Sequence, residues 1–205
     1  MALPTPLQES PLLSQEPLPP VPRLKITREM YRRMAELGLF EGKRVELIEG
    51  EVLEISPVSP RHFASGDRIQ RLFNTIFHEG FWVRFQGPLT LGESEPEPDI
   101  AVVSGTPESY EEAYPTTAVL VVEIVDASLH YDRTYKLSLY ARAGIPEYWI
   151  VNLKERVLEV YRNPIPLGET MFGHGYKLRE ILRPGETVHP LAKPDAAIAV
   201  SELLR

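Results

Sequence analysis

The sequence predicts an α/β fold in which helices flank one mixed β-sheet, and three observations support this prediction. Segments with the apolar spacing of helices alternate along the chain with segments that have the spacing of strands. Residues 118–125 are almost continuously apolar, which is typical of a central strand covered on both faces. Glu49-Gly50 and residues 153–156 each separate two strand-like runs, so we expect hairpins there. The order of these elements contains no internal repeat.

The first 22 residues differ in composition from the rest of the chain. They contain seven prolines and no lysine or arginine, and they show neither helical nor strand periodicity. We expect a flexible proline-rich arm, because such a segment buries too little surface to offset the entropy lost on ordering. The remaining residues, 23–205, are long enough for one well-buried core. We therefore expect a single domain there.

The N-terminal half of this domain is predicted to contain a helix, a hairpin, a long helix and three strands. The first helix begins after Thr27 as its N-cap and ends at Gly38. A hairpin follows over residues 44–55. The second helix has about twenty residues, because Ser59-Pro60 supplies an N-cap and an N1 proline and Gly80 ends it. The three strand candidates are residues 81–91, 99–103 and 118–125.

The C-terminal half is predicted to begin with a third helix. This helix covers residues 128–143, with Ser128 as its cap and Gly144 after its end. The later elements are a hairpin of strands 147–152 and 157–161, a strand near 176–182 and a closing helix near 200–204.

The composition excludes several functional classes. The chain has no cysteine, so disulfides, thiolate metal sites and cysteine nucleophiles are absent. No apolar run approaches the roughly 18 to 20 residues of a membrane span, and the N-terminus lacks a signal-peptide pattern. We therefore expect a cytoplasmic protein with no membrane partner. Because the net charge is −7, binding to nucleic acid would depend on local positive charge.

Two acidic residues stand out from the strand pattern. Asp99 follows Pro98 at the start of a β-branched strand, and Glu123 is the single charge within the apolar strand 118–125. If the two strands are neighbours, the carboxylates converge, and a divalent cation would relieve their repulsion. Oxygen ligands of this kind suit Mg²⁺ or Mn²⁺. The alternative is that Asp99 caps a turn and Glu123 pairs with an arginine or lysine.

Lys136 is the candidate cationic side chain near these acids. It lies between Asp132 and Tyr140 at helical spacing, on the helix that follows the Glu123 strand. It can reach back toward the carboxylates and would orient an attacking water or stabilise phosphate charge. The alternative is an exposed ion pair between Asp132 and Lys136.

The second helix carries the best local surface for phosphates. Arg61, Arg68 and Arg71 fall within a sector of roughly 80° and form a basic ridge suited to DNA, although a solvated helix face is the alternative. His62, in the first turn, is a further candidate for nucleic-acid contact, with a structural hydrogen bond as its alternative. Glu46, on the first hairpin, is a further acidic candidate, and the alternative is that it is an outward-facing strand residue.

These residues belong to an ordered series of motifs. The series is Arg44-Val45-Glu46-Leu47-Ile48-Glu49-Gly50-Glu51, Ser59-Pro60-Arg61-His62, Pro98-Asp99, Val122-Glu123-Ile124, then Asp132, Lys136 and Tyr140, then Ala143-Gly144-Ile145 and Glu147-Tyr148-Trp149-Ile150-Val151. Over about residues 25 to 200, it resembles the Uma-two family of bacterial restriction-endonuclease-like proteins, within the PD-(D/E)XK nuclease superfamily.

The resemblance implies a restriction-endonuclease-like mixed sheet flanked by helices, with an N-terminal helix and hairpin. It also implies Mg²⁺-dependent phosphodiester hydrolysis. Asp99 and Glu123 would be metal ligands with the Ile124 carbonyl as a third, Glu46 would be a supporting acid, and Lys136 would take the lysine role.

The sequence departs from the expected pattern at two places. The superfamily expects a lysine two residues after the glutamate, where this chain has Val125, and the family pattern moves that role to Lys136. Asp126-Ala127 stands where relatives commonly show Ser-Pro, which affects the local turn.

The leading functional prediction is a DNA endonuclease that uses Mg²⁺ or Mn²⁺. Two cuts in a duplex suit two-fold symmetry, so we expect a homodimer. The first alternative is a catalytically inactive nuclease-fold module that binds nucleic acid or protein, because the chain is acidic and carries Val125. The second is a structural or assembly protein whose acids are simply paired.

Overall fold

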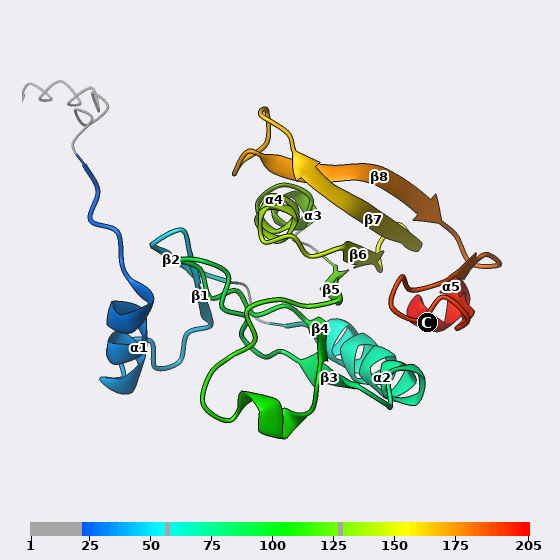
Figure 1. The fold of residues 1–205 in the computed structure, drawn as a ribbon, viewed down its shortest axis with the longest axis horizontal. Helices are drawn as coiled ribbons and strands as arrows, with labels where there is room; N and C mark the ends of the chain where they lie inside the picture. Colours follow the sequence, from blue (N-terminus) through cyan, green and yellow to red (C-terminus); the bar gives the residue numbers. More distant parts are fainter. Residues whose placement is uncertain (1–21, 56–57, 127–128) are drawn as a thin grey trace, which may run out of the picture.

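The fold is described from a computed structural model over residues 22–55, 58–126 and 129–205. Its centre is a six-stranded sheet in the order β3-β4-β5-β6-β7-β8 (Figure 1). Within it β5 and β6 pair in parallel, and the other neighbouring strands pair antiparallel. The strands are β3 (Phe81–Phe85), β4 (Ile100–Ser104), β5 (Leu120–Val125), β6 (Glu147–Asn152), β7 (Val157–Pro166) and β8 (His174–Leu182).

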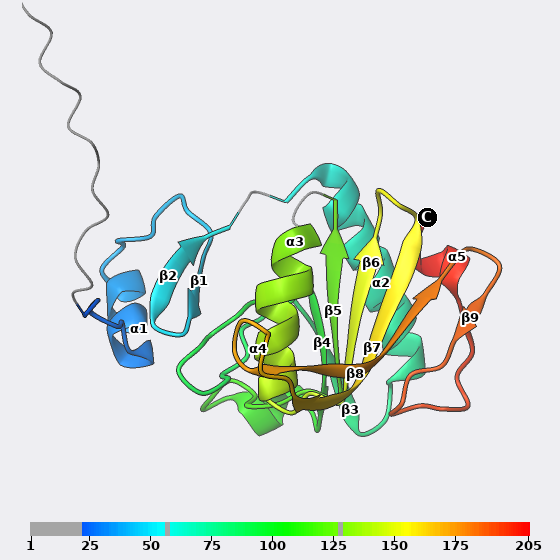
Figure 2. The ribbon, with the colours of Figure 1, turned by 90° about the horizontal axis from the view of Figure 1, so that it is seen from above.

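Helices cover both faces of this sheet, which confirms the predicted mixed α/β class. In Figure 2, α3 and α4 cross in front of the strands and α2 runs behind them. Alternate residues of β5 contribute to two separate cores, and all six of its residues are buried. It is therefore the covered central strand that its apolar sequence predicts. The helices are α2 (Pro60–Ile76), α3 (Leu129–Tyr131), α4 (Leu137–Arg142) and α5 (Val200–Leu203).

The predicted N-terminal helix and hairpin are confirmed. They are α1 (Arg28–Glu36) and the antiparallel pair β1 (Val45–Ile48) and β2 (Glu51–Glu54). Thr27 caps α1 by accepting a hydrogen bond from the Met30 amide. The hairpin turns at Glu49 and Gly50, which both have positive φ. These elements lie beside the sheet, at the end opposite α5 (Figure 2).

Several predicted boundaries were wrong. The strand expected over 81–91 ends at Phe85, because Gln86 adopts a φ of 48° and Pro88 follows two residues later. Both β7 and β8 are longer than predicted. The short elements η1 (Pro107–Tyr110), β9 (Thr187–Val188) and β10 (Ile198–Ala199) were not predicted.

The helix predicted over 128–143 contains a change in helical type. Its middle turn, η2 (Asp132–Lys136), is a π-helix between α3 and α4. The predicted cap Ser128 and the proline-rich arm up to residue 21 lie outside the described residues. Across the described ranges, no helix is both long and apolar enough to cross a lipid bilayer.

Candidate functional site

The pairing of β4 with β5 brings Asp99 and Glu123 together. The register pairs Ile100 with Val122, so the residue before Ile100 lies across from the residue after Val122. The Asp99 amide donates to Glu123 Oε2 at 3.2 Å, and the Ile124 amide donates to Asp99 Oδ2 at 2.8 Å. The two acids therefore meet, as the sequence predicts, whereas their role as metal ligands stays a prediction.

Glu123 lies in a buried polar cluster with Glu46, Lys136 and Tyr140. The Tyr140 hydroxyl donates to Glu123 Oε1 at 2.7 Å, and Lys136 Nζ lies 3.2 Å from the same oxygen. Lys136 Nζ also lies 2.7 Å from Glu46 Oε1. Lys136 therefore reaches the carboxylates, as expected.

Burial settles two of the alternatives. Lys136 and Asp132 are each only 4% exposed, so an exposed pair between them is the wrong interpretation. Glu46 is 1% exposed, so its reading as an outward-facing residue is also wrong. The alternative for Glu123 was a pair with an arginine or lysine. Glu123 does pair with Lys136, but Asp99 also lies beside it, as the metal-site interpretation requires.

Lys136 lies in a π-helical turn. Asp132 and Lys136 are the first and last residues of η2, and both are buried. A π-helix closes its hydrogen bonds over five residues, which alters the direction of the side chains that follow. Such turns inside α-helices are frequent at functional sites. The apolar spacing contains no signal for this turn.

The cluster has more negative than positive charge. Burial raises the pKa of Glu123 to about 8, and although Lys136 opposes this shift, Asp99, Asp132 and Glu46 reinforce it. Burial alone would lower the pKa of Lys136, but Glu123 and Glu46 outweigh it and raise the pKa well above its ordinary value. Burial and the charge of Glu46 also raise the pKa of Glu97. The site therefore has a deficit of cations.

An acidic cavity of about 640 Å³ opens onto this cluster. Its wall comes from the hairpin, the start of α2, the adjoining ends of β4 and β5, and the α3–η2 helix. Arg44 and Lys136 are the lysine or arginine side chains among its lining residues, against eight carboxylates. These are Glu46, Glu51, Glu54, Glu97, Asp99, Glu123, Asp126 and Asp132.

The donor set fits a hard divalent cation with few protein ligands. Carboxylate and carbonyl oxygens suit Mg²⁺ or Mn²⁺, and Mg²⁺ keeps several waters in its coordination shell. Glu46 Oε2 is buried and has no hydrogen-bond partner among the described residues, which also indicates a missing cation or donor. In the described ranges, no group of three or more acidic or histidine side chains is arranged for a metal. Asp99 and Glu123 would therefore act with the Ile124 carbonyl and water.

His62 contacts one of the two predicted ligands. Its Nε2 lies 2.8 Å from Asp99 Oδ1, so its ring is positioned to orient that carboxylate. Ser59 caps α2 and accepts a hydrogen bond from the His62 amide. A Cβ at Gly66 would collide with the ring of Phe85, so glycine lets this part of α2 approach the sheet closely.

The predicted basic ridge is partly engaged within the protein. Arg61 donates to the Leu153 carbonyl at 3.0 Å, and Arg68 donates to the carbonyl of Arg205. Arg71 pairs with Asp67 at 3.0 Å along the exposed helix face. Arg61 alone of the three also approaches Asp126, at 3.9 Å, and Asp126 lines the acidic cavity. The role of the ridge in binding DNA stays a prediction.

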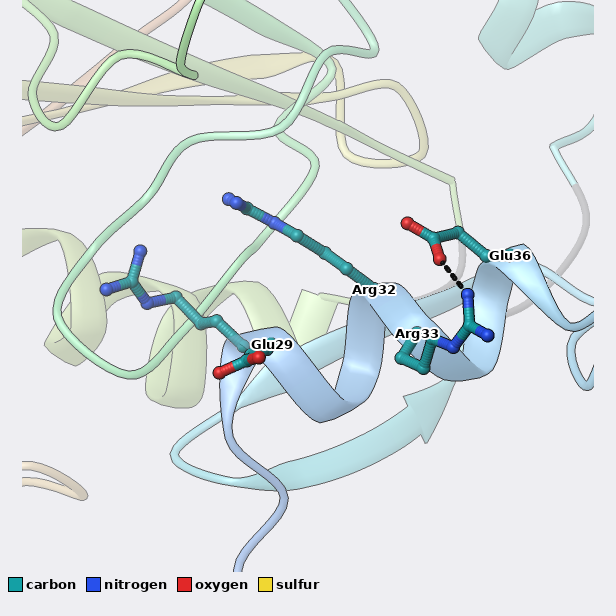
Figure 3. Close-up of a pocket in the computed structure, with 5 residues that line it drawn as sticks. Glu29, Arg32, Arg33 and Glu36 are labelled. Atoms are coloured by element: carbon teal, nitrogen blue, oxygen red, sulfur yellow. Dashed lines mark hydrogen bonds and ion pairs between the residues drawn. The ribbon is translucent and has the colours of Figure 1, made fainter.

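A second hollow, of about 630 Å³, lies on the surface of α1 (Figure 3). Arg33 pairs there with Glu36 at 2.8 Å, and Arg32 extends away from the helix and pairs with the buried Glu95. None of the predicted site residues lines this hollow. The acidic cavity is therefore the candidate functional site.

Comparisons with known proteins agree with this fold. The chain is similar to a "putative nuclease belonging to DUF820" from Anabaena variabilis ATCC 29413, known from its crystal structure. The TM-score is 0.63 at 16% identity, and the match covers 79% of this chain and 90% of that chain. No curated protein matches the sequence. The model of the Uma2 family, described as "Putative restriction endonuclease", matches residues 28–201, so the chain belongs to the Uma2 family.

Proposed function

We propose that this protein is a metal-dependent endonuclease that hydrolyses DNA phosphodiester bonds. The observation that carries the proposal is the meeting of Asp99 and Glu123 at the wall of a cavity that Lys136 also lines. The description of the Uma2 family and the nuclease title of the similar structure support the same reading.

The two acids and the Ile124 carbonyl would hold Mg²⁺ or Mn²⁺. When bound, such an ion polarises a phosphate and lowers the pKa of a water ligand. Asp99 would be oriented for this task from two sides, because His62 contacts one of its oxygens and the Ile124 amide donates to the other. Glu123 receives a similar constraint from the Asp99 amide and the Tyr140 hydroxyl.

Lys136 would orient the attacking water and stabilise charge on the phosphate. Val125 occupies the position where the superfamily has its lysine, and its side chain is buried in the core against α4. A lysine at that position would be buried in the same apolar core. The helix that packs on this face supplies Lys136 instead, and Glu46 holds its ammonium group.

Cleavage of DNA by wild type and by Asp99→Ala, with Mg²⁺ or Mn²⁺, tests this proposal. We expect the substitution to reduce the rate by about 10³-fold or more, because it removes a ligand to the ion that stabilises the transition state. Asp195→Ala is the matched control, since Asp195 is exposed and does not line the acidic cavity. Equal cleavage by wild type and Asp99→Ala would remove the proposed mechanism.

A second candidate is a nuclease-fold module that binds nucleic acid or protein without cleaving it. The cavity favours only the protein-binding form of this alternative, because its carboxylates repel the phosphates of nucleic acid when no divalent cation is present. Titration calorimetry separates the two candidates. Absence of Mn²⁺ binding to wild type would favour the module over the enzyme.

A further inference from the structure

Glu123 already has several hydrogen-bond donors. Its Oε1 accepts hydrogen bonds from Tyr140 and Lys136, and its Oε2 accepts one from the Asp99 amide. A carboxylate oxygen offers about two acceptor positions, so Oε1 is saturated. A cation that binds Glu123 must therefore displace a donor from Oε1 or share Oε2.

Of these donors, Lys136 has the best alternative position. Its Nζ lies closer to Glu46 Oε1, at 2.7 Å, than to Glu123 Oε1, at 3.2 Å. Glu46 Oε1 also accepts from the Glu97 amide, whereas Glu46 Oε2 is buried without a partner among the described residues. Glu46 can therefore accept a second hydrogen bond from the ammonium group if Lys136 leaves Glu123.

Charge also opposes simultaneous binding of the lysine and a divalent cation to Glu123. Lys136 is 4% exposed and Glu123 is 5% exposed, so water and salt screen the interactions between charges at this place only weakly. Two positive groups held on one buried carboxylate repel each other strongly at such short range. Lys136 differs in this respect from the other five lysines of the sequence, which all lie within the described ranges and are exposed or half-buried.

We propose that Lys136 is a resident cation of this site and competes with the divalent ion for Glu123. Without the ion, the ammonium group bridges Glu46 and Glu123 and offsets their repulsion. When the ion binds, Lys136 shifts onto Glu46 alone. The shift frees an ammonium N–H that can then hydrogen bond to water or a phosphate oxygen. This inference rests on the proposed function and adds an antagonism between Lys136 and the ion.

Calorimetric titration with Mn²⁺ of wild type, Lys136→Gln and Lys177→Gln tests the proposal. We expect Lys136→Gln to bind Mn²⁺ about tenfold more tightly or better, because a competing charge is removed. Lys177→Gln is the matched control, since it makes the same change of charge at an exposed residue of β8 that does not line the cavity. Its affinity should stay within about threefold of wild type, because water and salt screen an exposed charge. Unchanged or weaker binding by Lys136→Gln, or equal tightening by both variants, would overturn the proposal.

The outcomes also separate this inference from the proposed function. If wild type binds no Mn²⁺ and Lys136→Gln does, the lysine competes as proposed, but the unmodified site is not a metal centre. If wild type binds Mn²⁺ and the substitution leaves the affinity unchanged, the metal centre stands and the competition is wrong. If neither protein binds Mn²⁺, both are wrong.

A measurement on the wild-type chain covers the case in which Lys136→Gln does not fold. In protein labelled with ¹⁵N-lysine, the buried ammonium group should give a side-chain resonance distinct from those of the five more exposed lysines. Titration with Mg²⁺ should shift this resonance as Lys136 exchanges partners. A resonance that stays fixed while Mg²⁺ saturates the site would contradict the proposal.

Discussion

Two buried glutamates of the sheet, Glu123 on β5 and Glu159 on β7, have opposite electrostatic surroundings. Glu159 is fully buried and accepts hydrogen bonds from Arg133 at 3.0 Å, Arg179 at 2.9 Å and Tyr161 at 2.6 Å. Burial alone would raise the pKa of Glu159, but hydrogen bonds from Arg133 and Tyr161 lower it. For Glu123, burial raises the pKa to about 8 although Lys136 opposes it.

The difference lies in the number of cations available to each acid. Glu159 has two guanidinium groups, whereas Glu123 shares one ammonium group with Glu46 and lies beside Asp99. A buried acid with a full set of cationic donors is a structural ion pair. A buried acid with too few cations is a candidate for binding one, because the deficit costs stability until a cation arrives.

Removing the two charges should affect stability very differently. Glu159→Gln removes the anion that Arg133 and Arg179 share, and we expect a loss of about 2 kcal/mol in the free energy of unfolding, because hydrogen bonds to a charged group are lost. The loss is limited because both guanidinium groups are partly exposed and Arg133 keeps Glu155 at 3.8 Å. Glu123→Gln keeps an acceptor and relieves the charge deficit, so in EDTA it should cost less than about 1 kcal/mol. Urea unfolding measures both. A loss for Glu123→Gln as large as that for Glu159→Gln would show that the two glutamates do not differ in this way.

The next effect concerns the contact between His62 and Asp99. His62→Ala removes the side chain that orients Asp99 Oδ1, and we expect Mn²⁺ affinity to fall by about 10 to 100-fold. His78→Ala is the control, because His78 follows the same helix and its ring contacts the Thr75 carbonyl. Calorimetry should show no change for this control. Equal affinities for both variants would mean that His62 does not orient a metal ligand.

A third expected effect is a dependence of metal affinity on pH. Glu123 must lose its proton before its carboxylate can hold a cation, and its pKa is about 8. Mn²⁺ affinity should therefore rise by up to about tenfold per pH unit from pH 6 and level off near pH 8. The stability of the metal-free protein, measured in EDTA, should change with pH in the opposite direction. The contribution of Glu123 to the free energy of unfolding is full below its ordinary pKa of 4.5 and is lost as the pH rises toward 8.

Calorimetry at pH 6, 7 and 8 measures the affinity, and urea unfolding in EDTA measures the stability. Glu123→Gln should remove the slope in stability, since an amide does not titrate in this range. Affinity that is constant from pH 6 to pH 8 in wild type would contradict a raised pKa at the metal ligand.

The sequence predicted those parts of the site that depend on local pattern. Glu123 was recognisable as the lone charge in an apolar strand, and Asp99 as an acid at a strand start. Most helices and strands were likewise visible in the apolar spacing and the capping residues, such as Thr27 and Ser59. Each of these signals comes from residues close together in the chain.

The remaining parts depend on contacts between distant segments. The face of the hairpin on which Glu46 lies is fixed by Lys136, 90 residues later, and alternation alone does not identify it. For His62 the sequence left open a nucleic-acid contact and a structural hydrogen bond, and its contact with Asp99 depends on the close approach of α2 to the sheet, whereas the nucleic-acid contact stays a prediction. The role of Tyr140 depends on the π-helical turn before it, for which no signal was found in the sequence.

The proposed binding site for a divalent cation depends above all on Asp99 and Glu123. Its most direct test is calorimetric titration with Mn²⁺ at pH 8 of wild type, Glu123→Gln and Glu159→Gln, at a temperature at which all three are folded. We expect saturable binding by wild type and Glu159→Gln, and a loss of about 100-fold or more in affinity for Glu123→Gln. Binding of Mn²⁺ to Glu123→Gln with the affinity of wild type would contradict it.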